Sequence, residues 1–195
     1  MRIIAGSLRS RRLEAPPGLN TRPSSDRLRE TLFNVLAPRI EGAVFLDLYA
    51  GSGAVGIEAL SRGAARVEFV ELAPKALMVL RGNLEGLGLR AGFHIHAVAV
   101  GAALRKIQAG SGPNNGTKFD MVFLDPPWDA VDEYAATLGL LGGQAAGLLA
   151  GGALVIAEHR RKERLEERYG GLERTRLLEQ GDAALSFYGA ALQLL

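Results

Sequence analysis

Residues 43–60 read AVFLDLYAGSGAVGIEAL, an apolar run followed by a glycine-rich turn and a helical pattern. The run at 43–49 is apolar at nearly every position, which predicts a strand buried on both faces. Gly51 and Gly53 allow the backbone to turn tightly into a helix predicted over 54–62. A buried strand that leads directly into a helix is typical of a parallel sheet covered by helices.

The same alternation of apolar runs and helical stretches continues along the chain. Strands are predicted at 66–72, 93–98, 118–125 and 153–159, and helices at 74–86, 102–109 and 131–141. Two further strand-like runs, 172–180 and 183–195, flank Gly181-Asp182 and predict a terminal hairpin. The pattern therefore predicts an α/β fold with a seven-stranded, mostly parallel sheet and an antiparallel C-terminal strand.

The N-terminal part of the chain differs from this pattern. Short strands at 2–5 and 11–15 predict a small β-hairpin, and a helix is predicted over 25–37. Residues 1–39 hold eight arginines and three acids, a net charge of +5, whereas the whole chain carries +2. This asymmetry predicts an arm, 1–38, that binds a polyanion, and a body, 39–195; an arginine-rich solvated surface is the alternative.

Composition limits the kind of protein this chain can be. Its 195 residues, 48% hydrophobic and 23% charged, are enough for one globular domain with a small appendage. The absence of cysteine excludes a disulfide scaffold, a zinc ribbon and a thiol nucleophile. No apolar run reaches the roughly 18 residues of a membrane span, and the N-terminus lacks the apolar stretch of a signal peptide. We therefore expect a soluble, cytoplasmic protein.

Polar residues end the first two apolar runs of the body. In an open α/β sheet, ligands bind outside the carboxyl ends of the strands, so Asp47 and Glu71 are candidates. Gly51, Gly53 and Gly56, with Glu71 twenty residues further on, also match the dinucleotide fingerprint. Asp47 argues against a pyrophosphate, because a carboxylate before a glycine loop suits a cationic ligand such as S-adenosylmethionine. An ordinary strand-to-helix turn and a solvated strand end are the alternatives.

The fourth apolar run of the body ends in Asp125-Pro126-Pro127-Trp128. Two prolines hold a rigid, extended backbone that cannot continue the strand. A planar base can stack on Trp128 while its exocyclic amine donates to Asp125 and to a proline carbonyl. Such an amine must be held out of conjugation, with its developing positive charge stabilised, before it can attack a methyl group. A plain turn is the alternative interpretation.

These motifs together resemble the RsmD family, bacterial class I methyltransferases that methylate the N2 amine of a guanine in small-subunit (16S) ribosomal RNA. The resemblance rests on RIIAG at 2–6, RPSSDRLRETLFNVL at 22–36, DLYAGSGAVGIEALSRGA at 47–64 and DPPW at 125–128. It implies a Rossmann-like methyltransferase fold, S-adenosylmethionine as cofactor and 16S ribosomal RNA as partner, free or within the small subunit. No metal or protein partner is implied.

The resemblance also assigns roles to particular residues. The residues expected to bind the cofactor are Asp47, Tyr49, Ala50, Gly51, Ser52, Gly53, Glu71 and Leu72. Those expected to hold the target guanine are Asp125, Pro126, Pro127 and Trp128. The arginines expected to contact RNA are Arg9, Arg11, Arg12, Arg22 and Arg27. One departure is the stretch His96–Val100, which lacks the Asp or Asn that often binds adenine, so backbone groups and apolar packing are expected there.

Two other functions remain open from the sequence. A DNA adenine-N6 methyltransferase shares the Asp-Pro-Pro-aromatic motif, although a larger target-recognition region would be expected. A non-catalytic nucleic-acid-binding protein that keeps the fold is the other alternative. The basic run Arg160-Arg161-Lys162-Glu163-Arg164 is interpreted as a solvated helix, with RNA contact as the alternative.

Overall fold

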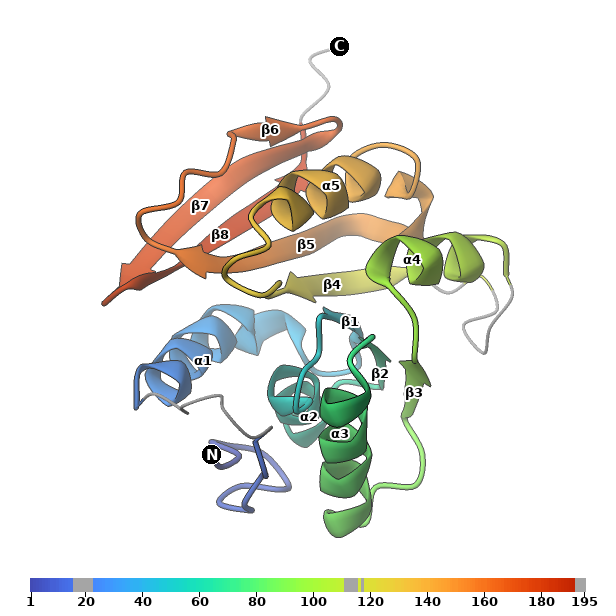
Figure 1. The fold of residues 1–195 in the computed structure, drawn as a ribbon, viewed down its shortest axis with the longest axis vertical. Coiled ribbons are helices and arrows are strands. Elements are labelled where there is room, and N and C mark those ends of the chain that lie inside the picture. The colour runs from blue at the N-terminus through green and yellow to red at the C-terminus, as the bar shows by residue number, and fades with distance from the viewer. Residues whose placement is uncertain (16–22, 111–115, 117, 192–195) are drawn as a thin grey trace.

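The computed structural model describes residues 1–15, 23–110, 116 and 118–191. An eight-stranded sheet with the order β3-β2-β1-β4-β5-β8-β7-β6 crosses the molecule (Figure 1). The strands are β1 (Val44–Leu48), β2 (Arg66–Val70), β3 (Phe93–His96), β4 (Phe119–Leu124), β5 (Leu149–Arg160), β6 (Arg168–Tyr169), β7 (Leu172–Gln180) and β8 (Ala183–Ala190). The first five are parallel and the last three antiparallel, which confirms the predicted mixed α/β sheet.

Helices cover both faces of this sheet. They are α1 (Pro23–Leu36), α2 (Ala54–Ser61), α3 (Pro74–Gly86), α4 (Val100–Gln108) and α5 (Asp132–Leu141), with short 3-10 turns at Ala37–Arg39 and Ala146–Leu148. Alternate residues of β1 point to opposite sides, because side chains alternate along a strand. Phe45 joins the core under α1, α2 and α3, whereas Leu46 and Leu48 join the core under α4 and α5.

Two predictions need correction, the number of strands in the sheet and the helix predicted at the basic run 160–164. It has eight strands instead of seven in the part of the chain described, because Arg168 and Tyr169 pair with Glu173 and Leu172. A two-residue strand is too short to leave an alternating pattern in the sequence. The basic run at 160–164 is also not a helix, since β5 continues to Arg160 and a turn follows.

The N-terminal hairpin is reduced to a single bridge between Arg2 and Arg12. Backbone hydrogen bonds still hold its two segments antiparallel, from Ile3 N to Arg11 O at 3.0 Å and from Leu13 N to Met1 O at 3.0 Å. A longer β-ladder does not form between the described parts of the two segments, because two of the backbone N–H groups have another acceptor. Ile4 N and Ala5 N both donate to the Glu58 carboxylate. The predicted second strand, 11–15, is followed by residues 16–22, which lie outside the described part of the chain.

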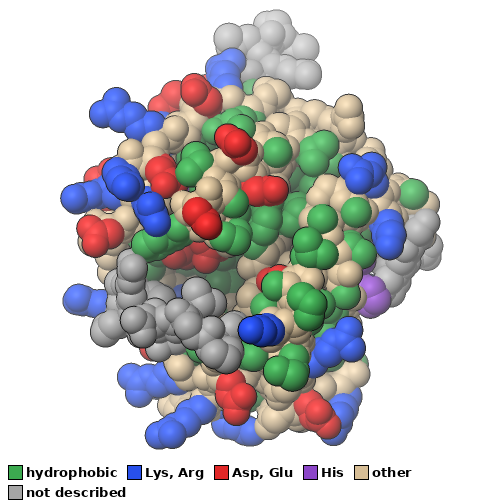
Figure 2. All heavy atoms as spheres, viewed as in Figure 1, with side chains coloured by type: hydrophobic (Ala, Val, Ile, Leu, Met, Phe, Trp, Pro, Cys, Tyr) green, Lys and Arg blue, Asp and Glu red, His purple; other side chains and the backbone are tan. Residues whose placement is uncertain are grey.

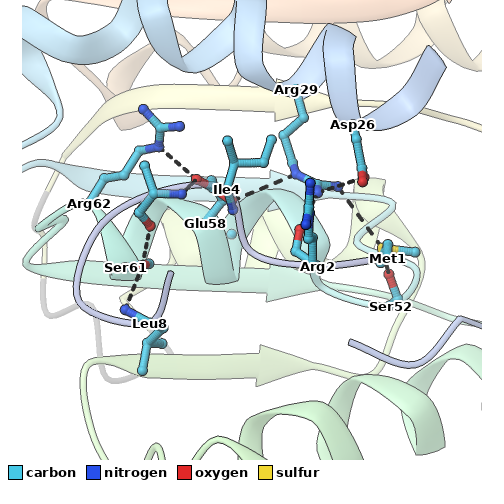
Figure 3. A network of polar contacts seen from close by, with 12 residues as sticks. Met1, Arg2, Ile4, Leu8, Asp26, Arg29, Ser52, Glu58, Ser61 and Arg62 are labelled. Carbon is cyan, nitrogen blue, oxygen red and sulfur yellow. Dashed lines mark hydrogen bonds and ion pairs between the residues drawn. The ribbon is translucent and has the colours of Figure 1, made fainter. Parts of the chain in front are cut away.

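Glu58 of α2 fastens this N-terminal segment to the body (Figure 3). Its fully buried carboxylate accepts hydrogen bonds from Ile4 N at 2.8 Å, Ala5 N at 3.0 Å and Arg62 Nε at 2.7 Å. Arg29 Nε of α1 lies 3.8 Å from the same carboxylate. Residues from the hairpin, α1 and α2 therefore share one buried ionic cluster.

Apolar packing reinforces this attachment. The side chains of α1 that enter the core are Leu28, Leu32, Phe33 and Leu36, and Phe33 stacks on Phe45 of β1 with ring centroids 6.5 Å apart. Ile3 of the hairpin is buried in the same core. None of the helices described is both long and apolar enough to cross a membrane.

Candidate functional site

Four acidic side chains lie at the carboxyl ends of neighbouring parallel strands. Asp47 is in β1, Glu71 follows β2, Asp125 follows β4 and Glu158 lies near the end of β5. The pairing of Leu124 with Ala157 places Asp125 next to Glu158 across the β4–β5 ladder. Figure 2 shows a hollow on this face of the molecule, with acidic side chains around it. The order of the strands thus brings together carboxylates that are far apart in the sequence.

The glycine loop between β1 and α2 forms one wall of this site. The buried carboxylate of Asp47 accepts a hydrogen bond from Gly56 N at 2.8 Å, which ties the end of β1 to the first turn of α2. Gly53 precedes the helix with φ +79°, and its N–H donates to Ala50 O at 2.7 Å. A Cβ on Gly53 would overlap Leu80, so the loop requires glycine here for its backbone conformation and for space.

Tyr49 and Ser52 of this loop make contacts away from the glycines. The Tyr49 hydroxyl donates to Glu133 Oε2 at 2.6 Å and lies 2.7 Å from Thr137 Oγ1, so it anchors the loop to α5. Burial and the Glu133 contact raise the pKa of Tyr49 well above its usual value. The Ser52 hydroxyl contacts the sulfur of Met1. The polar ends of these two side chains therefore serve to position the loop.

Glu71 joins the glycine loop to the loop after β2. Its carboxylate accepts hydrogen bonds from Gly51 N at 2.8 Å, Leu72 N at 2.8 Å and Ala73 N at 2.7 Å. These backbone donors hold a half-buried carboxylate in one orientation at the edge of the site. Leu72 beside it is 62% exposed, an unusual exposure for a large apolar side chain. The two predicted cofactor segments are thus in direct contact.

Gly56, the third glycine of the dinucleotide pattern, has a packing role. A Cβ at this position would overlap the Phe69 ring and a methyl group of Val67, both in β2. The missing side chain therefore allows α2 to approach the sheet closely, which is the usual role of that glycine in such folds.

Three acidic side chains of the site have raised pKa values, because they are desolvated and lie close to other acids. Burial raises the pKa of Asp47 to about 7, the Gly56 donor acts in the opposite direction, and the charges of Asp125 and Glu71 raise it further. Burial also raises the pKa of Asp125 to about 7. Burial and the Asp125 charge raise the pKa of Glu158, whereas the Arg29 charge lowers it. A site with these groups favours a ligand that brings a positive charge.

The Asp125–Trp128 segment leaves β4 at the same edge. Asp125 and Trp128 are half-buried, Pro126 is buried and Pro127 is exposed. The Pro127 carbonyl already accepts a hydrogen bond from Ala130 N at 2.8 Å. Of the two proline carbonyls, that of Pro126 is therefore the candidate acceptor for an exocyclic amine.

A pocket of about 330 Å³ opens beside Trp128. Its lining residues are Trp128, Arg160, Arg161, Lys162 and Asp182. The Arg160 guanidinium carbon lies 4.7 Å from the centroid of the Trp128 ring, a cation–π contact. This pocket places the turn after β5 next to the predicted base-stacking residue.

Two residues of this region, Glu158 and Arg29, were missed in the sequence. Glu158 is the last residue but one of the fifth apolar run of the body, much as Asp125 is the last residue of the fourth, and that parallel was a usable signal. Arg29 is a buried cation of α1, and its charge acts on Glu158 across the fold. No local pattern marks Arg29 as a residue of the site. Arg160 belongs to the basic run for which RNA contact was the alternative interpretation, but its contact with Trp128 exists only because the two residues meet at one edge of the sheet.

The predicted RNA-binding arginines among the described residues lie on the N-terminal hairpin and on α1, and none of them lines the pocket beside Trp128. Arg9, Arg12 and Arg27 are exposed, while Arg11 donates to the Gly86 carbonyl at 3.1 Å. Arg22 lies outside the described residues. Their contact with RNA remains a prediction.

Known proteins resemble this chain over nearly its full length. A family model described as "Conserved hypothetical protein 95" matches residues 1–189. The chain is 36% identical to "Putative rRNA methyltransferase YlbH" of Bacillus subtilis, over 96% of this chain and 98% of that protein. It is also 41% identical to "Ribosomal RNA small subunit methyltransferase D" of Escherichia coli over 128 residues, which are 66% of this chain and 60% of that protein.

Solved structures confirm the predicted fold class. "Putative methyltransferase yhhF" from Escherichia coli superposes with a TM-score of 0.81 and 33% identity, over 99% of each chain. A protein described as "a putative methyltransferase complexed with SAH" shares the fold at 14% identity, with a TM-score of 0.63 over 83% of this chain and 49% of that chain. The sheet and its helices are therefore those of a Rossmann-like methyltransferase.

Proposed function

Because this chain belongs to the RsmD family, we propose that it transfers a methyl group from S-adenosylmethionine to the N2 amine of a guanine in 16S ribosomal RNA. The family and the methyltransferase fold support the class of reaction. The choice of a guanine amine is supported by Asp125-Pro126-Pro127-Trp128 at the edge of the sheet. A cytoplasmic location and a substrate that is free RNA or an assembling small subunit belong to the same proposal.

S-adenosylmethionine is the cofactor, and the residues present fit it. Its amino acid and sulfonium groups bring positive charge, which the surplus of carboxylates at this edge accommodates. We assign Asp47, Gly51 and Gly53 to the amino acid end and Glu71 to the ribose, with exposed Leu72 packing against the adenine. The remaining loop residues, Tyr49, Ala50 and Ser52, shape that wall. When bound, the cofactor supplies an electrophilic methyl group.

One observation supports the amine as the acceptor of the methyl group. Asp125 follows β4 directly, and β4 pairs with β1, whose end carries the glycine loop. An amine held by Asp125 and the Pro126 carbonyl therefore lies on the strand next to the cofactor loop. Trp128 offers its ring to the base, which must leave its stack to reach the site.

Asp125 then acts on the proton of the reacting amine. Hydrogen bonds from the amine N–H groups to the Asp125 carboxylate and the Pro126 carbonyl hold the amine out of conjugation with the ring. They also stabilise the positive charge that develops as the nitrogen gains a methyl group. A carboxylate with a pKa of about 7 can accept the proton that the nitrogen loses and pass it to solvent at neutral pH.

Transfer of labelled methyl groups tests this proposal. Tritiated S-adenosylmethionine is incubated with naked 16S ribosomal RNA and with small subunits from a strain that lacks the enzyme, followed by nucleoside analysis. We expect N2-methylguanosine as the product, little transfer by Asp125→Ala and near-normal transfer by the control Asp129→Asn, whose side chain is exposed. Methylated adenine in DNA, or the absence of transfer to either substrate, would contradict the proposal.

A further inference from the structure

The turn after β5 carries a concentration of positive charge next to the site. Arg160, Arg161 and Lys162 line the 330 Å³ pocket together with Trp128, and Asp182 is the acid among its lining residues. The pocket therefore has a positive balance, in contrast to the acidic site at the ends of the neighbouring strands. It suits an anion, whereas the acidic site suits a cation.

The cations of this turn are available to a ligand. Arg161 and Lys162 are exposed, and neither forms an ion pair with an acid among the residues described. Arg160 is paired only loosely, since its Nη1 lies 3.9 Å from Glu163 Oε1. An incoming phosphate can thus gain these charges without displacing a tight ion pair.

The backbone holds this turn in place. Arg160 is the last residue of β5 and pairs with Ala183 of β8. The next residue, Arg161, donates its N–H to Asp182 O at 2.8 Å, and Glu163 N donates to Arg160 O at 2.9 Å. The backbone of the three basic residues is therefore held by the sheet and by the β7–β8 turn, so that the chain itself does not have to be ordered when a ligand binds.

Arg160 connects the basic pocket to the base-binding residue. Its guanidinium lies 4.7 Å from the centre of the Trp128 ring. A nucleotide whose base occupies the site at Trp128 carries its backbone phosphates close by, on the same strand of RNA. Guanidinium and ammonium groups are the usual partners of such phosphates.

We propose that Arg160, Arg161 and Lys162 form a subsite for the backbone phosphate next to the target guanine. The inference rests on the proposed function and goes beyond it. It places part of the RNA path at the turn after β5, in the C-terminal part of the chain and outside the basic N-terminal arm. The subsite contributes binding affinity for the RNA strand whose flipped base stacks on Trp128. Methyl transfer itself takes place at Asp125.

The test compares two double variants with the same loss of charge. Arg161→Gln with Lys162→Gln removes two cations from the pocket, and Arg105→Gln with Lys106→Gln removes two exposed cations from the last turn of α4. Binding of naked 16S ribosomal RNA is measured at several salt concentrations, along with methyl transfer and calorimetric affinity for S-adenosylmethionine. All four substituted side chains are exposed, so both proteins are expected to fold.

We expect the pocket variant to weaken RNA binding roughly tenfold or more, the effect of losing hydrogen bonds to a charged group. Its salt dependence should flatten by about 0.7 to 0.9 for each lost phosphate contact. The KM for RNA should rise, while kcat at saturating RNA and cofactor affinity should change little. The α4 variant should behave like the wild type.

Different failures have different meanings. If the wild type binds S-adenosylmethionine but does not methylate 16S ribosomal RNA, the proposed function fails. If the wild type is active and the two double variants weaken RNA binding equally, the subsite is wrong and the function stands. An effect seen with small subunits but not with naked RNA would assign this surface to a ribosomal protein and overturn the subsite.

Discussion

Asp125 is half-buried, and desolvation raises the pKa of its carboxyl group to about 7. The ionised form of this side chain therefore destabilises the folded protein at the pH where the enzyme would use it. The unfolded chain ionises this group near pH 4, whereas the folded chain keeps it protonated up to about pH 7. The contribution of Asp125 to the free energy of unfolding is therefore most favourable below about pH 4, where the carboxyl group is protonated in both states. This contribution is lost as the pH rises from 4 through 7.

Replacing Asp125 with Asn should separate stability from activity. The amide stays uncharged, so at about pH 8 the variant is expected to unfold at a higher temperature than the wild type. The difference should narrow at about pH 5.5, where the wild-type carboxyl is mostly protonated. Methyl transfer should fall strongly at both values. Thermal unfolding at the two pH values checks this, and a difference that is independent of pH would refute the assigned pKa.

Glu71 tests the ribose contact. Glu71→Ala should weaken S-adenosylmethionine binding by about 1.5 to 3 kcal/mol, the range for hydrogen bonds that involve a charged group. The loss of an acceptor for three backbone N–H groups also loosens the loop, so Glu71→Gln, which keeps one carbonyl oxygen, should lose less. Calorimetry measures both, with exposed Glu85→Ala as control. Unchanged affinity in folded Glu71→Ala, or tight NADH binding by the wild type, would exclude the assignment.

At the scale of elements, the start of α2 depends on the backbone of Gly53. Gly53 and Gly88 have similar positive φ angles, +79° and +74°, but only at Gly53 would a Cβ meet other atoms. Alanine at either position carries the strain of a left-handed residue, about 1 to 2 kcal/mol. Gly53→Ala should be destabilised further by its overlap with Leu80, and it should also weaken cofactor binding. Equal unfolding free energies from urea titration would count against this role of Gly53.

Helix α3 and the basic run after β5 show where the residue pattern of a short stretch predicts structure and where it does not. The predicted helix 74–86 coincides with α3, which begins at a proline suited to the first helical turn. The basic run after β5 was predicted as a helix because its charges alternate, yet it forms a turn. Its backbone bonds to Asp182, a partner that no window around residue 160 contains.

At the scale of the whole molecule, Glu58 connects the N-terminal segment, α1 and α2. Glu58→Gln leaves Arg29 and Arg62 with one fewer charge partner in a buried cluster, so unfolding should be easier by about 3 to 5 kcal/mol. Urea unfolding measures this, with exposed Glu41→Gln as the control. A stability equal to that of the control would mean that apolar packing alone holds the segment.

The division into an RNA-binding arm, 1–38, and a body, 39–195, remains a proposal. Its test must leave the apolar contacts between α1 and the body intact. Deleting residues 1–38 would remove Leu28, Leu32, Phe33 and Leu36 from the core, so aggregation is expected. Reversal of exposed Arg9 or Arg12 to Glu is cleaner. Each should weaken RNA binding and flatten its salt dependence by roughly 0.7 to 0.9 per lost contact, with cofactor affinity unchanged. Affinities equal to that of exposed Arg90→Glu would identify the arm as a solvated surface.

Much of the fold could be inferred from the chain alone. Buried strands, glycine turns and amphipathic helices leave their marks within a few residues, since side-chain period and backbone conformation are local properties. The helices at 54–62 and 74–86 and the parallel strands were therefore predictable to within a few residues. The two motifs after β1 and β4 were visible for the same reason, and the family resemblance made the methyltransferase class predictable.

Tertiary structure alone decided which residues meet at the site. Asp125 and Glu158 are neighbours because β4 and β5 pair in one particular register, and desolvation by the surrounding chain raises the pKa of both. Arg160 contacts Trp128 because β5 extends further than its apolar run predicts. Such contacts join segments that are tens of residues apart, and their energies depend on burial, which is a property of the folded molecule and not of any short stretch of sequence.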